Sequence, residues 1–318
     1  MALSQGRLWG SFSSNLIGVI LKILVFVKAV PDTRISLELN EAMGHLRTEG
    51  LVMQWNPPDR AALETALRIK EIIPDTHITL VHLGPFSGER WIREGLALGS
   101  DTGIRIWDDG FGDLSPGGKA FLFSRTAEVL GFDLILTGDR SQDTGSGQVG
   151  ALMAGQLGLP CITSVISLEL EWAKRSIIAR KVLSRGYEES IRCGLPLVVT
   201  MGEYPFAERD SSFPALLEAL GKEILRWDLG RLGISEESLR KKEQRLTFSP
   251  LRFPRPRVRA IPAPDSSLPA FYRILKLLEG SVQRRGGKLI EKNEDELVEE
   301  LFQTLRSEGW LDHLRKEG

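Results

Sequence analysis

The sequence predicts an α/β protein with a parallel sheet, because short β-branched segments alternate with longer segments of helical periodicity. Strands are expected at residues 22–30, 77–83, 104–107 and 133–137, and the segments between them are long enough for crossover helices. A loop rich in glycine and serine, residues 138–150, follows the fourth strand and leads into another helical segment. With 318 residues, 42% of them hydrophobic, the chain can form one large or two modest domains with a real core.

The helices between these strands are indicated by apolar spacing and by proline and glycine at their ends. Pro58 suits the first turn of a helix that runs through Lys70, with Asn56 or Pro57 marking its start. A second helix is expected from about residue 87 to 98, stopped by a glycine, and a third from about residue 117 to 131. Strands and helices therefore alternate as a parallel sheet requires.

The loop at 138–150 has the composition of a phosphate-binding cradle. Its glycines allow the backbone to approach an anion, its hydroxyl and N–H groups can donate to it, and the next helix adds the positive end of its dipole. Adenine nucleotide is the expected ligand. The loop is not a Walker A sequence or a Gly-x-Gly-x-x-Gly fingerprint. An ordinary turn and helix cap remains the alternative that these residues alone leave open.

After the cradle the pattern changes to antiparallel pairing. Residues 176–183 and 187–193 flank Ser184-Arg185-Gly186 and predict a hairpin, and residues 197–201 predict a further buried strand. In parallel α/β sheets, ligands lie beyond the carboxyl ends of the strands. The segments that follow Val27, Val81 and Thr137 are therefore expected to meet at one edge.

From about Leu225 the sequence becomes more charged and is interrupted by proline. Residues 250–259 are expected to form an extended arm that cannot build a core. The four arginines of this stretch are compatible with RNA, but without interleaved aromatic residues a protein-binding surface or a solvated linker is favoured. Asn293 and Glu296 then predict a capping box before a helix with one apolar face.

Composition and charge narrow the classes of function. The formal net charge of −1 gives no general attraction to nucleic acid or to an anionic membrane. Cys161 and Cys193 lack the spacing of metal ligands and are too few for a disulfide framework, which indicates a reducing, cytoplasmic location and no metal site. The first twenty residues contain one charged residue, Arg7, and are interrupted by Gly, Ser and Asn, so we expect a loose tail.

Four segments together resemble the β subunit of the electron transfer flavoproteins (ETFs). They are Val27-Lys28-Ala29-Val30-Pro31-Asp32-Thr33, Asn56-Pro57-Pro58-Asp59 with Ala62 and Glu64, Leu83-Gly84-Pro85, and Asp143 with Gln148-Val149-Gly150. The resemblance covers residues 21–223 and is weaker beyond them. It implies a twisted parallel sheet of the adenine-nucleotide α-hydrolase-like (Rossmann-like) type. The domains expected from it are a tail at 1–20, a nucleotide-binding domain at 21–224, and an arm at 225–318 that packs on an α subunit.

The same resemblance implies partners and cofactors. The chain would form a heterodimer with an ETF α subunit that holds FAD, and would carry electrons from an acyl-CoA dehydrogenase or similar flavoprotein, as in fatty acid β-oxidation. The acceptor would be a quinone reductase or another protein, so any membrane contact is indirect, through a quinone oxidoreductase. A second nucleotide, AMP or FAD, would bind in the β subunit itself.

The residues that this resemblance assigns to nucleotide or flavin binding come from the strand ends, one helix start and the cradle. They are Phe26, Asp32, Thr33, Asn56, Pro57, Pro58, Asp59, Leu83, Gly138, Asp143, Thr144, Gly145, Ser146, Gly147, Gln148 and Val149. Asp32 and Thr33 would approach the flavin side, and Phe26 would act through its backbone. Gln148 is expected to contact the ligand directly, whereas Asp143 either caps backbone N–H groups or binds a ribose hydroxyl.

No catalytic side chains are assigned, because the sequence shows no carboxylate pair, Ser-His-Asp set or activated cysteine. Redox chemistry would come from bound flavin, which makes the chain an electron carrier and not a stand-alone enzyme. The resemblance also implies a dehydrogenase-docking segment, with Phe213 as the protruding anchor beside Leu216 and Leu217. The residues alone equally allow Phe213 to begin an ordinary core helix.

Alternatives to this interpretation concern the second nucleotide and the class of protein. Bifurcating ETFs, which bind a second FAD, resemble Asp-Gly-Asp-Thr-Ala-Gln-Val-Gly in the cradle, whereas this chain has Asp143-Thr144-Gly145-Ser146-Gly147. The choice between AMP and a second FAD therefore stays open. An ATP-using enzyme of the same fold is disfavoured, because such enzymes carry a glycine-rich loop after the first strand and residues 28–32 contain no glycine. A nucleotide sensor is a third class, and it would be colourless.

Overall fold

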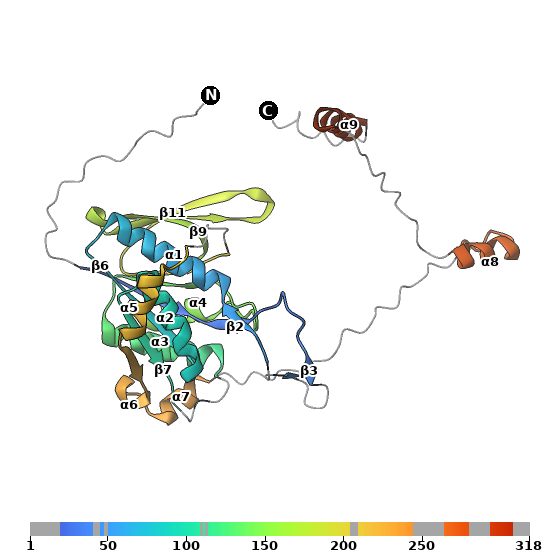
Figure 1. The fold of residues 1–318 in the computed structure, drawn as a ribbon. Helices are drawn as coiled ribbons and strands as arrows, with labels where there is room; N and C mark the ends of the chain where they lie inside the picture. The colour runs from blue at the N-terminus through green and yellow to red at the C-terminus, as the bar shows by residue number, and fades with distance from the viewer. Residues whose placement is uncertain are drawn as a thin grey trace. The chain divides into compact units, whose positions relative to one another are not determined.

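The computed structural model describes residues 20–40, 45–47, 50–108, 111, 114–203, 209–243, 264–279 and 293–307 (Figure 1). The chain divides into two compact units, Met1–Arg252 and Phe253–Gly318. Most of the expected N-terminal tail and all of the proline-rich stretch at 250–259 lie outside the described residues. The first unit contains the sheet and the candidate site.

The described part of the first unit confirms the predicted α/β class with a nine-stranded, mostly parallel sheet in the order β11-β10-β9-β12-β8-β1-β6-β7-β13. The parallel strands are β1 (Leu21–Val27), β6 (Thr76–Leu83), β7 (Thr102–Ile106), β8 (Leu134–Gly138), β9 (Cys161–Glu171), β12 (Leu197–Met201) and β13 (Ile224–Trp227). The predicted hairpin is present as β10 (Ser176–Val182) and β11 (Glu188–Gly194), which extend one edge in antiparallel fashion.

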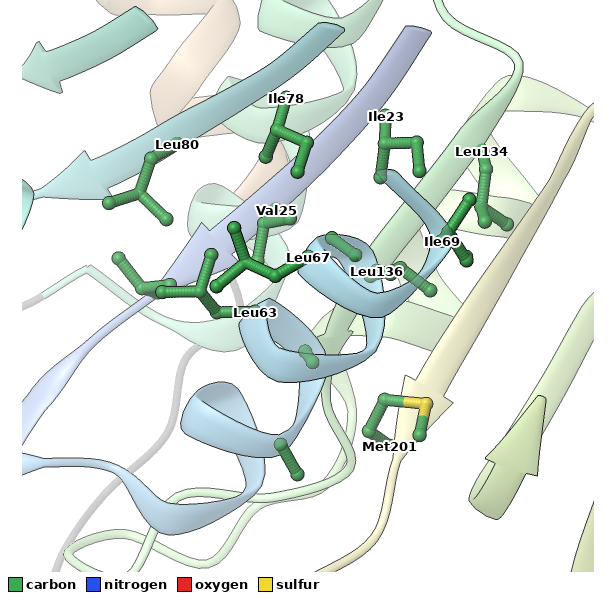
Figure 2. Packing of buried hydrophobic residues seen from close by; sticks show 14 of the residues in the cluster. Ile23, Val25, Leu63, Leu67, Ile69, Ile78, Leu80, Leu134, Leu136 and Met201 are labelled. Carbon is green, nitrogen blue, oxygen red and sulfur yellow. The ribbon is translucent and has the colours of Figure 1, made fainter. Parts of the chain in front are cut away.

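Helices cover both faces of the sheet, which explains why its central strands are mainly apolar on both faces. Helices α1 (Pro57–Ile72), α2 (Glu89–Leu98) and α5 (Phe213–Gly221) contribute buried residues to one core. Helices α3 (Pro116–Leu130), α4 (Val149–Leu157), α6 (Leu229–Leu232) and α7 (Glu236–Lys242) contribute to the other. Strand β1 serves both cores by alternation: Ile23 and Val25 lie in the core with α1 (Figure 2), and Leu24 and Phe26 belong to the opposite one.

The ends of the helices follow the predicted signals closely. Helix α1 begins at Pro57, one residue before the expected Pro58, with Asn56 as its N-cap. Helix α2 follows the 3-10 turn η1 (Phe86–Gly88) and ends at Leu98. Its C-cap, Gly99, has a φ of 123°, which is readily adopted only by glycine. Before α1, the chain forms two small antiparallel pairs, β2 (Ala29–Pro31) with β5 (Met53–Trp55), and β3 (Leu39–Asn40) with β4 (His45–Leu46).

The boundary expected between residues 224 and 225 falls inside β13. Leu225 pairs with Ile104 of β7, and α6 and α7 pack against α3, so the sheet domain continues past this point. The strand is four residues long and a charged sequence follows it. Composition alone therefore placed the end of the sheet domain too early in the sequence. Helices α8 (Ala270–Glu279) and α9 (Glu294–Ser307) lie in the described part of the second unit.

The capping residues predicted for α9 are in contact. Asn293 Oδ1 accepts a hydrogen bond from Glu296 N at 3.0 Å, and Asn293 Nδ2 donates to Glu296 Oε1 at 3.3 Å. The first bond satisfies an N–H group that has no partner within the helix. Across the described residues, no helix combines the length and the apolar character needed to cross a membrane.

Candidate functional site

The cradle lies at the carboxyl edge of the sheet, between the end of β8 and the start of α4. Strand β1 is in parallel register with both neighbours, so that Phe26 is paired with Val81 of β6 and with Thr137 of β8. The ends of β1, β6 and β8 therefore lie side by side. This is the convergence that the sequence predicts.

Two buried side chains at the start of α1 join these strand ends to the cradle. Asp59 accepts hydrogen bonds from Lys28 N at 2.8 Å and from Gly138 N at 2.9 Å, so one carboxylate bridges the ends of β1 and β8. Asn56 donates to Arg140 O at 3.0 Å and accepts from Gln142 N at 3.1 Å. The first part of the cradle is thus fixed to α1 through its main chain.

Glycine is required where Asp59 meets β8. A Cβ atom on Gly138 would lie 2.2 Å from Asp59 Oδ1 and 2.9 Å from Pro58 Cβ. Burial raises the pKa of Asp59 to about 7, although hydrogen bonds from Asn56, Lys28 and Gly138 lower it. Close packing around this carboxyl therefore makes it unusually basic.

A buried histidine completes the strand ends on the other side of β1. His82 Nδ1 lies 3.1 Å from Val27 O. Because a carbonyl oxygen can only accept, this nitrogen carries the ring proton and donates a hydrogen bond to the carbonyl. Burial lowers the pKa of His82 to about 4, so the ring is neutral near pH 7. The ring lies beneath the loop that follows β6, because a Cβ atom on Gly84 or Gly88 would come within 2.6 Å or 2.2 Å of His82 Nε2.

The second part of the cradle has the shape of an anion site. Gly145 and Gly147 both have a φ of 61°, which glycine adopts without strain. The first intrahelical bond of α4 runs from Leu152 N to Gln148 O, so the N–H groups of residues 149–151 have no partner within the helix. A Cβ atom on Gly150 would lie 2.4 Å from Thr200 Cγ2, so only glycine allows α4 to begin this close to the sheet.

Asp143, one of three charged residues in the cradle with Asp139 and Arg140, is engaged within the protein. Asp143 forms an ion pair with Lys28 and accepts a hydrogen bond from Thr144 N at 2.6 Å. Burial raises the pKa of Asp143, but hydrogen bonds from Lys28 and Ser141 outweigh that effect and hold it below its usual range. Asp143 thus caps the loop, which is one of the two roles expected of it.

The remaining assigned residues occupy the same edge. Phe26 is buried and its ring lies 4.6 Å from that of Phe123, so only its backbone faces the edge. Leu83 is half-buried at the end of β6, and Gln148 is exposed at the N-cap of α4 without a side-chain capping bond. Thr144, Gly145 and Gly147 are exposed, while Ser146, Val149 and Pro57 are half-buried.

The residues expected on the flavin side are connected to the cradle by side-chain hydrogen bonds. Asp32 is buried and binds Arg34 through both oxygens, and these bonds hold the pKa of Asp32 below its usual range. Arg34 Nη2 donates to Gln54 Oε1 at 3.2 Å, and Gln54 Nε2 donates to Gln142 Oε1 at 3.2 Å. Thr33 is exposed next to this network.

These donors fit the phosphate of a nucleotide. Hydroxyl groups, left-handed glycines and unpaired N–H groups at a helix start are the groups that proteins use for phosphate. Sequence reasoning missed three contributors, Lys28, His82 and Arg34. Lys28 stands inside a segment of the quoted resemblance, but its link to Asp143 depends on two strands that are far apart in the sequence.

The residues assigned to partner docking form a second group, on α5. Phe213 is 72% exposed, Leu217 54% and Leu216 39%, whereas Ala219 is buried on the opposite side. The alternative that Phe213 fills the core is therefore wrong. Ser212 caps the helix, since its Oγ accepts from Ala215 N at 3.3 Å.

Both ends of α5 are held by arginines of the sheet domain. Arg93 of α2 donates to Ala219 O and Leu220 O at 3.0 Å and to Lys222 O at 3.3 Å. Ahead of the helix, Arg209 binds Glu64 of α1 with two hydrogen bonds of 2.7 and 3.0 Å. Arg60, in the first turn of α1, donates to Arg209 O at 2.9 Å. The exposed apolar face of α5 is thus fixed relative to α1 and α2.

Comparison with known proteins agrees with this geometry. Residues 44–230 match the family model described as the electron transfer flavoprotein domain. The chain is 32% identical over 219 residues to the caffeyl-CoA reductase-Etf complex subunit CarD of Acetobacterium woodii, covering 69% of this chain and 82% of that one. It is 30% identical over 227 residues to the electron transfer flavoprotein subunit beta of Bacillus subtilis, covering 70% and 84%.

A further relative is the electron transfer flavoprotein subunit beta of Thermoanaerobacterium thermosaccharolyticum. The two chains are 31% identical over 206 residues, which cover 65% of this chain and 77% of the relative. The matched family model spans more than half of the sequence, including the cradle and α5. The chain therefore belongs to the electron transfer flavoprotein family, as a β subunit.

Proposed function

We propose that this chain pairs with an α subunit to form a carrier that takes electrons from an acyl-CoA dehydrogenase or a similar flavoprotein. The acceptor is a quinone reductase or another redox protein. FAD bound with the α subunit supplies the redox chemistry. The name of the relative from Acetobacterium woodii joins an Etf to a reductase of a CoA thioester, which supports a partner that acts on such thioesters.

The observation that carries this proposal is the convergence of the cradle with the ends of β1 and β6 in a chain of this family. We propose that this site binds an adenine nucleotide, with its phosphate at residues 144–150. The glycines at 145 and 147 let the main chain approach the phosphate, and the Ser146 hydroxyl and the first N–H groups of α4 donate to it. The exposed amide of Gln148 is free to contact the sugar or base.

The exposed face of α5 supports a second part of the proposal, docking to the dehydrogenase. Phe213, Leu216 and Leu217 form an apolar surface on a helix whose two ends are anchored. A rigid aromatic anchor of this kind loses little conformational entropy on binding and is typical of an interaction hot spot.

The test is to express the chain together with its α subunit and analyse the purified pair. The absorbance spectrum reports flavin, and chromatography of the released small molecules identifies each nucleotide. We expect a yellow complex with one FAD and one further adenine nucleotide, AMP or a second FAD, per heterodimer. Two FAD molecules per heterodimer would show that the β site holds flavin. A lone, colourless chain, with or without ATP turnover, would overturn the proposal in favour of a sensor or an ATP-using enzyme.

A further inference from the structure

Lys28 is the first residue after β1, and its main chain is fixed by hydrogen bonds on both sides. Its N–H group donates to Asp59 at 2.8 Å, and its carbonyl accepts from Asn56 N at 3.0 Å. Because both partners belong to the start of α1, the backbone of Lys28 cannot rotate independently of that helix. The direction in which its side chain leaves β1 is therefore set by the fold.

That side chain extends to the cradle, where its ammonium group pairs with Asp143. The pair is partly accessible to solvent, with 34% of the Lys28 side chain and 25% of the Asp143 side chain exposed. Asp143 keeps a second bond inside the loop, from Thr144 N at 2.6 Å. The Asp143 carboxylate therefore keeps its position within the cradle even if the Lys28 ammonium group turns toward another acceptor.

A phosphate in this loop would meet a carboxylate that repels it unless a cation offsets the charge. The cradle's own cation, Arg140, is exposed, whereas Lys28 already pairs with this carboxylate from the end of a neighbouring strand. A Walker A loop instead carries its lysine within the loop itself. We propose that Lys28 is a phosphate-binding residue of this site and that Asp143 holds its ammonium group in position until a nucleotide phosphate shares it. This inference rests on the proposed nucleotide site and assigns to it a cationic side chain from outside the loop.

The experiment compares AMP with adenosine, which lacks only the phosphate. The co-expressed heterodimer, freed of bound nucleotide by dialysis, is titrated with each probe by calorimetry. We expect Lys28→Met to weaken AMP binding by about tenfold or more, since it removes a charge-assisted hydrogen bond, and to leave adenosine binding within about twofold. Lys22→Met, which removes an exposed lysine near the start of β1, is the matched control and should change neither the AMP affinity nor the adenosine affinity.

Two further variants separate a direct contact from simple neutralisation of Asp143. In the Lys28→Met, Asp143→Asn double variant, AMP should still bind about fivefold or more weakly than it does to Asp143→Asn alone, because the phosphate contact remains lost. Equal AMP affinity in these two proteins would overturn the inference. Lys28→Arg retains the cation and should stay within about threefold of the original AMP affinity, which guards against a methionine variant that only misfolds.

The outcomes also distinguish this inference from the proposed function. Suppose that the unmodified complex binds AMP and that Lys28→Met binds AMP equally well, or that its AMP and adenosine affinities fall by the same factor. Lys28 is then not a phosphate ligand, and the proposed nucleotide site is unaffected. If the unmodified complex binds no adenine nucleotide, the proposed site fails and the role of Lys28 fails with it.

Discussion

Asp59 and His82 hold the two sides of a single peptide group. His82 donates to Val27 O at 3.1 Å, and Asp59 accepts from Lys28 N at 2.8 Å, so the peptide between residues 27 and 28 lies between two buried titratable side chains. These two hydrogen bonds hold the peptide group in one orientation and so fix the end of β1, from which the Lys28 side chain extends to the cradle. The two groups have pKa values shifted in opposite directions by the same cause, burial.

These shifts predict opposing effects of pH on stability. The pKa of Asp59 is raised from 3.8 to about 7. Its contribution to the free energy of unfolding is therefore fully present below pH 3.8 and is lost as pH rises toward 7. The pKa of His82 is lowered from 6.5 to about 4, so its contribution is present above pH 6.5 and is lost as pH falls toward 4. Between about pH 4 and 6.5 the two dependences offset each other.

Single substitutions should uncover each dependence in turn. Over about pH 4 to 6.5, the unfolding free energy of Asp59→Asn should rise with pH relative to the unmodified chain, and that of His82→Gln should fall. Denaturant titrations at several pH values measure both. Curves for the two variants that run parallel to that of the unmodified chain would contradict the assigned pKa shifts.

Gly147→Ala should weaken nucleotide binding. Its φ of 61° is strained for any residue with a Cβ atom, at a cost of about 1–2 kcal/mol, and the new atom would lie 3.4 Å from Asp139 O. Gly155→Ala is the control, because this residue lies in the interior of α4 with nothing within 4 Å of the added atom. The control should raise stability by about 0.5–1 kcal/mol and leave AMP affinity unchanged, as calorimetry and melting curves can verify.

Phe213→Ala should impair partner recognition without destabilising the fold. The side chain is 72% exposed, so its loss should change the unfolding free energy by no more than about 0.5 kcal/mol. Removal of a docking anchor should cost about 2 kcal/mol or more of association with the dehydrogenase. The measurement is dehydrogenase-dependent flavin reduction as a function of carrier concentration.

The control for this prediction is Phe86→Ala, which removes a 68% exposed ring outside α5. It should leave both the flavin content and the kinetics with the dehydrogenase unchanged. Unaltered kinetics in Phe213→Ala would mean that the docking surface lies elsewhere. A large fall in its melting temperature would instead indicate that the ring is covered in the heterodimer.

Truncation should separate folding of the sheet domain from pairing with the α subunit. A chain ending at Glu243 keeps every strand of the described sheet together with α1 through α7. Helices α8 and α9 expose apolar side chains, including Phe271, Ile274, Leu301 and Phe302, and we expect these to be buried by the α subunit. The truncated chain should fold but not co-purify with its partner; normal co-purification would assign these helices another use.

Much of the fold could be predicted from local sequence, because the central strands and the helices on either side carry strong signals. The run from Ile23 to Val27, buried throughout, and the proline at the start of α1 are examples. Strand β13 was missed, since four residues before a charged segment give too short a pattern and pairing with β7 decides their conformation. Length and tertiary contact, not local propensity, determine such an edge strand.

The position of the cradle between a strand and a helix was predicted for a similar reason. The glycines and hydroxyls of the cradle are adjacent in sequence, so composition reveals them. The links that hold the loop, from Asn56 to Arg140 and from Lys28 to Asp143, join residues that become neighbours only when the strands align. Such pairs cannot be predicted from a local sequence pattern. The pKa values of Asp59 and His82 cannot be predicted from it either, because they depend on burial in the folded protein.

The start of α1 contacts two separate parts of the surface. Asn56 and Asp59 hold the cradle, and Arg60, the next residue, binds the main chain ahead of α5. One helix end therefore supports both the cradle and the exposed face of α5, the two surfaces to which separate ligands are proposed to bind. Any substitution that tilts this turn would displace both surfaces together, so under the proposed function the affinities for nucleotide and for dehydrogenase could not be altered independently at this helix end.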